Sequence, residues 1–122
     1  MFDFFCEIKD DLSYIEAELK KIVGAFGGVI GEAAVHLCNA GGKRLRPAFA
    51  LLSGHFGRYD LAKVAPLAVA VELIHMATLV HDDVVDGAAV RRGRPTVQRL
   101  WGNRTAIRAG DSIFAKAIEL VA

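Results

Sequence analysis

Three carboxylates, Asp82, Asp83 and Asp86, follow an apolar stretch and are expected at the carboxyl end of a helix. At about 100° per residue, Asp82 and Asp86 each fall within about 20° of His75, so these side chains share one stripe. The helix dipole and like-charge repulsion disfavour carboxylates there, so a cation must offset them. Two carboxylates one turn apart, with no thiolate beside them, suit Mg²⁺, which takes its other ligands from water and phosphates. A solvated acidic helix end is the alternative interpretation.

Positive charge is concentrated just before another predicted helix, at Lys43, Arg44 and Arg46. Pro47 suits the first turn of that helix. Cations normally avoid a helix amino terminus, because the free N–H groups there already present positive charge. A cluster of cations at such a point therefore predicts an anion site, with phosphate as the natural ligand. A solvated basic loop is the alternative.

A second basic segment, with Arg91, Arg92 and Arg94, follows the carboxylates across Gly87. The loop can fold these cations back toward a metal-bound diphosphate, whose oxygens guanidinium groups bind in pairs. Taken alone, this segment could instead contact RNA or a protein partner. Together, the three complementary clusters in one short chain favour a metal and diphosphate site.

The elements that must position these clusters are all helices, which predicts an all-α fold. Apolar residues recur with a 3.6-residue period from Phe4 to Val23, opposite a charged face. Glycines and capping residues divide the rest of the chain. Further helices are expected over 32–39, over 47–56, from Asp60 to the carboxylate cluster, and from near Thr96 or Asn103. Residues 91–95 are expected in a loop, because no two-residue periodicity or hairpin turn is visible.

Composition limits the possible functions. The 122 residues fit one domain, and 53% hydrophobic with 24% charged residues exclude a disordered tail. The net charge of +1 excludes a globally basic protein that binds nucleic acid. Cys6 and Cys38 match neither a metal pair nor a disulfide scaffold, so both are expected as reduced, packed thiols.

The sequence also predicts where the chain resides. Its first residues lack the basic segment and apolar core of a secretion signal, so a cytoplasmic location is expected. The apolar run from Val64 to Val80 approaches the length of a membrane span, but Pro66, Glu72 and His75 interrupt it. We therefore expect a buried helix of a bundle and no transmembrane segment.

Three segments, in this order and spacing, resemble the trans-prenyltransferases, which are polyprenyl diphosphate synthases. They are GGKRLRP at 41–47, ELIHMATLVHDDVVD at 72–86 and RRGRPT at 91–96. The later residues WGN at 101–103 and GD at 110–111 match as well. The resemblance implies an isoprenoid-synthase helical bundle around a central cavity, and condensation of isopentenyl diphosphate with an allylic diphosphate.

The resemblance also implies roles for single residues. Asp82, Asp83 and Asp86 match the first aspartate-rich motif of the family, in which Asp82 and Asp86 would ligate Mg²⁺. Four residues match positions that hold the diphosphate of isopentenyl diphosphate, namely Lys43, Arg46, His75 and Arg92. Arg91 matches a position that holds the allylic diphosphate.

Ala77 and Thr78 bear on the length of the product. They lie just over one turn before Asp82 on a helix expected to line the product tunnel. Neither is bulky enough to stop a growing chain as Phe or Tyr would. This pattern resembles the members of the family that make hexaprenyl to decaprenyl chains.

One departure from the family shapes the functional hypothesis: the second aspartate-rich motif, found in the carboxyl-terminal half of its members, is missing from this sequence. We expect residues 1–122 to be the amino-terminal half of a synthase domain that another polypeptide completes as a hetero-oligomer. The apolar surplus would then form the interface. The alternatives are a fragment or disrupted gene product, a noncatalytic regulatory subunit, and an HD-type metal phosphohydrolase using His75 and the pair His81-Asp82.

Overall fold

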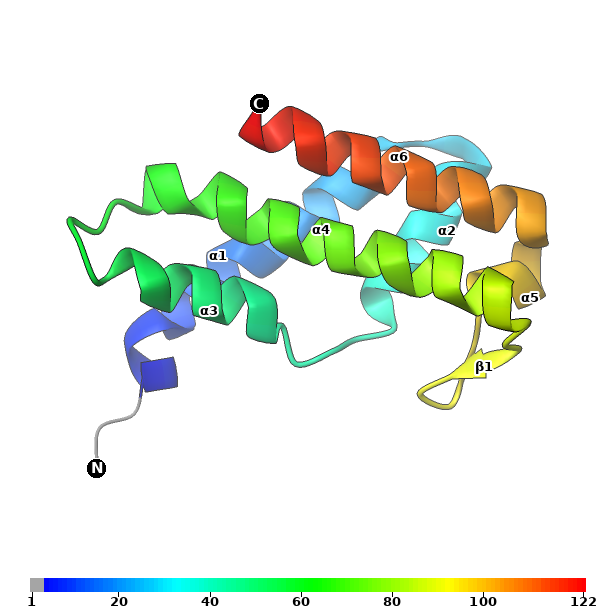
Figure 1. Ribbon diagram of the computed structural model, residues 1–122, viewed down its shortest axis with the longest axis horizontal. Helices are drawn as coiled ribbons and strands as arrows, with labels where there is room; N and C mark the ends of the chain where they lie inside the picture. The colour runs from blue at the N-terminus through cyan, green and yellow to red at the C-terminus, as the bar shows by residue number, and fades with distance from the viewer. Residues whose placement is uncertain (1–3) are drawn as a thin grey trace.

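The computed structural model describes the backbone of residues 4–122 and the side chains of residues 8–122. Six helices dominate it, which confirms the all-α prediction (Figure 1). In chain order the elements are α1 (Phe4–Ala25), α2 (Gly28–Asn39), α3 (Leu45–Gly54), α4 (Leu61–Asp86), β1 (Val90–Arg91), β2 (Arg94–Pro95), α5 (Val97–Trp101) and α6 (Asn103–Val121).

The periodic apolar stripe of α1 enters the core as expected. Ile8, Ile15, Leu19 and Val23 are all buried, and α1 packs against α2 and α3. Cys38 of α2 is a free, buried thiol, and burial raises its pKa. The side chain of Cys6 lies outside the described residues.

Helix α2 begins earlier than the sequence predicts. Its first residue is Gly28 rather than Glu32. Gly27 and Gly28 adopt the positive φ angles that glycine tolerates, which lets the chain turn sharply after α1. The carbonyl oxygen of Gly27 then accepts a hydrogen bond from the amide of Gly31 at 2.8 Å. The glycines that suggested a loose connection therefore form the first turn of the helix.

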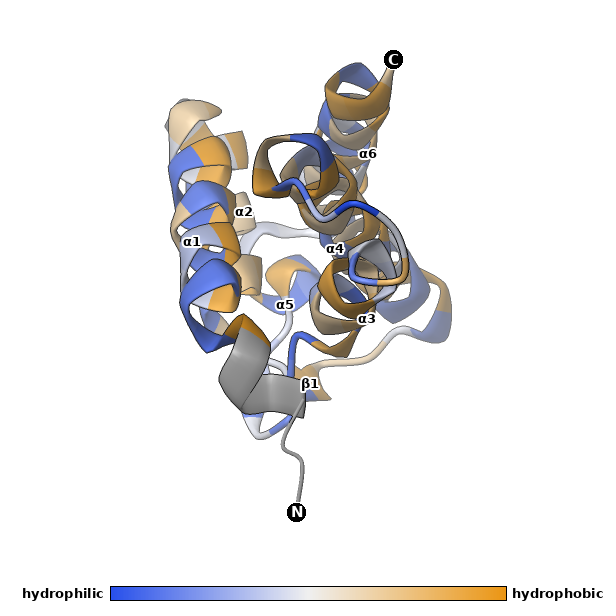
Figure 2. Ribbon diagram, turned by 90° about the vertical axis from the view of Figure 1, so that its left-hand side faces the viewer, coloured by the Kyte–Doolittle hydropathy of each residue, from blue (hydrophilic) through white to orange (hydrophobic). Residues whose placement is uncertain are grey.

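Helix α4 is the central element. Its N-cap is Asp60, whose carboxylate accepts a hydrogen bond from the amide of Ala62 at 3.1 Å. Seen along the bundle, α4 is flanked by α3 and α6, with α1 and α2 beside it (Figure 2). It is long and apolar enough to cross a membrane, but half of its most apolar window is buried inside the fold. Burial among neighbouring helices thus accounts for about half of this apolar window.

Helix α6 runs antiparallel to α4 and packs closely on it at Gly110 (Figure 1). A Cβ atom at Gly110 would overlap the ring of His81 and lie 2.9 Å from Cγ1 of Val80. His81 Nε2 lies 3.2 Å from the carbonyl oxygen of Ile107 and 3.3 Å from Oδ1 of Asp111. The absence of a side chain at Gly110 thus lets α6 approach the end of α4 that carries the carboxylates.

The loop expected over 91–95 is in fact a short hairpin. β1 and β2 pair antiparallel, with Val90 opposite Pro95 and Arg91 opposite Arg94. Arg92 and Gly93 form the turn, with φ angles of 52° and 75°. Turns with two positive φ angles usually begin with Asn or Gly, and arginine at the first position does not give that signal. The strands are also too short to show alternation.

The packing at Gly110 generates a prediction about stability. Gly110→Ala should lower the free energy of unfolding by about 1–3 kcal/mol, because the added methyl group must displace the His81 ring. Gly24→Ala is the matched control: Gly24 is helical and has no atom near its would-be Cβ. That change should raise the free energy of unfolding by about 0.5–1 kcal/mol. Urea unfolding of both variants tests this, and equal effects would contradict the packing role.

Candidate active site

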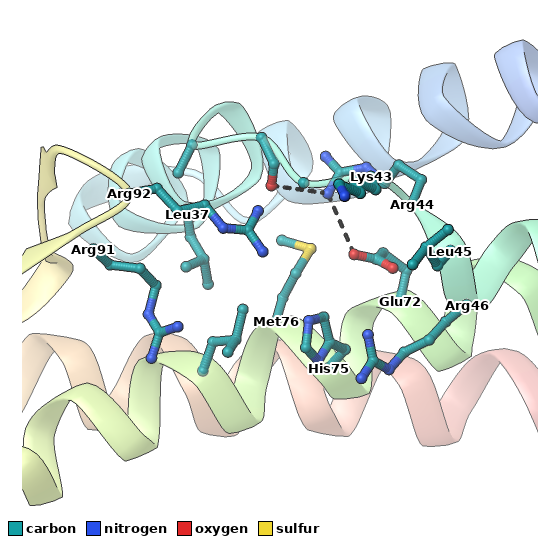
Figure 3. Close-up of a pocket in the computed structure, with 14 residues that line it drawn as sticks. Leu37, Lys43, Arg44, Leu45, Arg46, Glu72, His75, Met76, Arg91 and Arg92 are labelled. Carbon is teal, nitrogen blue, oxygen red and sulfur yellow. Dashed lines mark hydrogen bonds and ion pairs between the residues drawn. The ribbon is translucent and has the colours of Figure 1, made fainter.

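A cavity of about 430 Å³ opens between the end of α2, the loop before α3, the middle of α4 and the hairpin (Figure 3). All five predicted diphosphate-binding residues line it: Lys43, Arg46, His75, Arg91 and Arg92. Arg91 and Arg92 approach it from the hairpin, and Arg46 and His75 come from α3 and α4 on the opposite side (Figure 3). Two basic segments separated by the whole of α4 therefore meet around one space.

Backbone strain coincides with this cavity. Within residues 4–122, the non-glycine residues with positive φ are Arg44, at 53°, and Arg92, at 52°. Both line the cavity. Left-handed backbone is costly for a residue with a long side chain, and such conformations cluster at functional sites.

Arg44 differs from its basic neighbours in the direction of its side chain. Its side chain is only 10% exposed, and its guanidinium binds the Glu16 carboxylate through two hydrogen bonds of 2.7 and 3.2 Å. A third hydrogen bond, of 3.3 Å, reaches Glu72. Burial on its own lowers the pKa of Arg44, but the hydrogen bond and charges of these carboxylates outweigh it and raise the pKa. Of the three cations predicted to face an anion here, Lys43 and Arg46 remain exposed.

The hairpin is fastened to the end of α2. The Arg94 guanidinium donates to the carbonyl oxygen of Asn39 at 2.7 Å, and His36 Nε2 lies 2.8 Å from the carbonyl oxygen of Pro95. A Cβ atom at Gly42 would lie 2.9 Å from Nη1 of Arg92. The hairpin is thus tied to the end of α2 by the Arg94 side chain and by His36.

The three carboxylates of the aspartate-rich segment have two different environments. Asp83 is buried and binds Arg91, with Oδ1 at 2.8 Å from Nη2 and at 3.0 Å from Nε. Its hydrogen bond is the main cause of the raised pKa of Arg91, to which Asp82 and Asp86 also contribute. Asp82 and Asp86 are exposed on the same helix. The geometry therefore separates one carboxylate that orients Arg91 from two that face solvent.

The exposed pair fits a magnesium ion. Among the described side chains, no three from His, Cys, Asp and Glu converge on one point, so Asp82 and Asp86 offer two carboxylates without a protein cage. Mg²⁺ usually binds through one or two carboxylates and completes its shell with water and substrate phosphates. The same observation disfavours the HD-type alternative, which needs further His and Asp ligands around His75 and His81.

Several residues that support the site were not singled out from the sequence. The Gln98 side-chain amide donates to the carbonyl oxygens of Asp83, at 3.0 Å, and Ala88. The Thr96 hydroxyl donates to Ala88 at 2.8 Å and caps α5. Only the helix start at Thr96 gave a sequence signal, because tertiary hydrogen bonds from Gln have no fixed spacing.

The two residues predicted to set chain length lie in different surroundings. Ala77 is 1% exposed and belongs to the main apolar core. Thr78 is exposed, and its hydroxyl donates to the carbonyl oxygen of His75 at 2.7 Å. Of the two, Thr78 therefore offers a side chain that a ligand on the outer face of α4 could contact.

The Polyprenyl synthetase family model matches residues 28–122. The chain belongs to this family. It is 54% identical over 115 residues to heptaprenyl diphosphate synthase component 2 of Geobacillus stearothermophilus, a match that covers 94% of this chain and 36% of the relative. The aspartate-rich segment and the two basic segments thus lie in a chain of the polyprenyl synthetase family, as the sequence resemblance predicted.

Solved structures agree with this assignment. The heptaprenyl diphosphate synthase of Staphylococcus aureus superposes with a TM-score of 0.88 and 40% identity, over 93% of this chain and 36% of the other. The polyprenyl synthase of Caulobacter crescentus CB15, crystallised with calcium and isoprenyl diphosphate, superposes with a TM-score of 0.90 and 36% identity, over 97% and 36%. This polyprenyl synthetase family chain therefore spans about a third of the length of the relatives it matches.

The cationic wall of the cavity generates a prediction about His75. Burial lowers its pKa below the ordinary value of 6.5, and the charges of Arg46, Arg92 and Arg91 lower it further, against an opposing effect of Glu72. The charge of inorganic diphosphate in the cavity should reverse this shift and raise the pKa of His75. An NMR titration of the histidine resonances measures both states. The resonances of His55 are the control, because this residue stacks on Tyr59 and does not line the cavity. The prediction is contradicted if diphosphate leaves the pKa of His75 unchanged.

The strained turn generates a second prediction. Asn is favoured where the hairpin places Arg92, so Arg92→Asn should raise the free energy of unfolding by up to about 1 kcal/mol. The same change should weaken binding of inorganic diphosphate by about tenfold, because a guanidinium is lost. Calorimetric titration and urea unfolding measure the two effects. The control is Arg99→Asn, which removes an exposed charge outside the cavity and should leave the affinity for diphosphate nearly unchanged. Equal affinities of the two variants for diphosphate would contradict a binding role of Arg92.

Proposed function

We propose that this chain supplies the substrate- and Mg²⁺-binding part of a long-chain all-trans-polyprenyl diphosphate synthase that acts in the cytoplasm. That enzyme would condense isopentenyl diphosphate with an allylic diphosphate. The convergence of five cationic or imidazole side chains around one cavity carries this proposal. Family membership supports the prenyltransferase class.

The residues of the cavity would bind two different diphosphates. Lys43, Arg46, His75 and Arg92 would bind the diphosphate of isopentenyl diphosphate. Arg91, oriented by its paired hydrogen bonds with Asp83, would bind the allylic diphosphate. A guanidinium held by a buried carboxylate loses little side-chain entropy on binding, which favours a precise ligand geometry.

The chemistry that these residues support is electrophilic. Asp82 and Asp86 would hold Mg²⁺, which would supply electrostatic stabilisation of the departing diphosphate. Arg91 would stabilise the same charge as the allylic C–O bond breaks. The isopentenyl double bond, held by its diphosphate near His75, would then attack the allylic cation, and the released diphosphate would take the proton. Apolar helix faces must exclude water, which would otherwise quench the cation.

The outer surface of the bundle supports the need for further protein. Helices α3, α4 and α6 lie next to one another, with α4 in the middle (Figure 1). Each of them exposes large apolar side chains: Phe49 at 63%, Leu67 at 49% and Phe114 at 46%. Where such side chains form one contiguous patch, they mark an interface. We infer that a second polypeptide, carrying the second aspartate-rich motif, covers this surface.

The product is proposed to be a long prenyl chain. Thr78 is exposed on α4 and is too small to block an elongating tail. Ala77 is buried, so its contribution would be to leave the packing of α4 undisturbed.

The test is an elongation assay with isopentenyl and farnesyl diphosphates and Mg²⁺. We expect no turnover from this chain alone and turnover from its complex with the partner. Replacing Asp82 and Asp86 together by Ala should lower the activity of the complex by about 100- to 1,000-fold, because the metal site is lost. Glu32→Ala, which removes an exposed carboxylate outside the cavity, is the control.

The results of this assay distinguish a catalytic chain that needs a partner from the alternatives. Robust elongation by this chain alone would overturn the need for a partner. Full activity of the complex after both Asp substitutions would instead make this chain a noncatalytic subunit.

A further inference from the structure

Arg44 occupies an unusual position for a residue in a basic binding segment. Lys43 and Arg46, on either side of it, are exposed and line the cavity. The Arg44 guanidinium instead turns inward, toward Glu16 of α1 and toward Glu72 of α4 (Figure 3). Arg44 also lines the cavity, but its side chain is only 10% exposed and its charge is paired with these two carboxylates.

The contacts of Arg44 join most of the elements that surround the cavity. Besides the two carboxylates, its guanidinium donates to the carbonyl oxygens of Cys38 at 3.0 Å and Gly41 at 3.4 Å. These bonds use all three of its nitrogens. One planar group thus ties α1, the end of α2, the following loop and α4 together, which a point charge such as Lys cannot do.

The backbone conformation of Arg44 also indicates that surrounding contacts hold this residue in place. With a φ of 53°, it is left-handed and directly precedes α3, and no side chain caps that helix. This conformation costs free energy and persists only where surrounding contacts impose it. The hydrogen bonds of the Arg44 guanidinium supply such contacts at the point where the loop that carries Lys43 joins the first turn of α3, which carries Arg46.

A second effect is electrostatic. The Glu72 side chain is 5% exposed and lines the cavity, one helical turn before His75. An unpaired buried carboxylate there would repel a diphosphate. The ion pair with Arg44 offsets that repulsion.

We propose that Arg44 is a positioning residue for diphosphate binding: clamped by Glu16, it holds the loop so that Lys43 and Arg46 face the cavity, and it neutralises Glu72. The proposal rests on the proposed function, because it assigns the diphosphate to this cavity. It implies that Glu16, which does not line the cavity, controls the affinity of the site.

The test removes the Glu16 side chain, because a positioning role and simple electrostatics then predict opposite changes in the affinity for diphosphate. Loss of a negative charge near an anion site should strengthen binding by electrostatics alone. If Arg44 needs its clamp, Glu16→Ala should instead weaken binding of inorganic diphosphate by about tenfold, because the cations of the loop lose their alignment. Calorimetric titration of the chain measures this affinity. Glu18→Ala, on the same helix, removes a carboxylate that does not contact Arg44 and should leave binding unchanged or slightly tighter.

The outcomes separate this proposal from the proposed function. Failure of the unmodified chain to bind diphosphate would overturn both. If the unmodified chain binds diphosphate and Glu16→Ala binds it equally or more tightly, only the positioning role is overturned. The same conclusion follows if Glu16→Ala has a lower melting temperature but no loss of affinity. If Glu16→Ala does not fold, Arg44→Lys is used in its place. This variant keeps the positive charge but loses the planar guanidinium, so the affinity for diphosphate should again fall about tenfold. Unchanged affinity would overturn the proposal.

Discussion

Mutual repulsion among the cations around one cavity of about 430 Å³ is the constraint on which the rest of the structure depends. Lys43, Arg46 and Arg92 are exposed and Arg91 is partly buried, and like charges that line one cavity repel one another. Carboxylates pair with two of the arginines that line the cavity, and Asp83 and Glu72 among these carboxylates are buried. Asp83 binds Arg91, and Glu16 and Glu72 bind Arg44. These ion pairs fix Arg91 and Arg44, two of the cations that line the cavity.

The helices make this arrangement rigid. Helix α4 carries Glu72, His75 and the aspartate-rich segment on one continuous element, so their spacing along its axis is fixed by helical geometry. Close packing at Gly110 anchors the end of α4 that bears the carboxylates. The hairpin is in turn tied to α2 through Arg94 and His36. Stability and binding geometry are thus produced by the same contacts.

The sequence predicted much of this because the decisive signals are local. Apolar periodicity identified α1, and the expected cap at Asp60 located the start of α4. The sequence predicts one last helix from near Thr96 or Asn103, whereas the structure has two there, α5 from Val97 and α6 from Asn103. The family followed from the resemblance of three segments to the motifs of the trans-prenyltransferases, and the expected roles of the motif residues followed from the same resemblance. The hairpin escaped prediction because Arg92 occupies a turn position where Asn would have been recognised. The inward direction of Arg44 escaped as well, because its partner Glu16 lies 28 residues away and periodicity carries no information about such pairs.

The central claim is that this cavity binds diphosphate beside a divalent cation held by Asp82 and Asp86. A crystal structure of the chain grown with inorganic diphosphate and Mn²⁺, whose anomalous scattering identifies the metal, tests it most directly. The account predicts diphosphate density between Lys43 and Arg92 and an anomalous peak within coordination distance of Asp82 and Asp86. Diphosphate bound elsewhere, or a cavity that remains free of anion while the metal binds at another site, would contradict it.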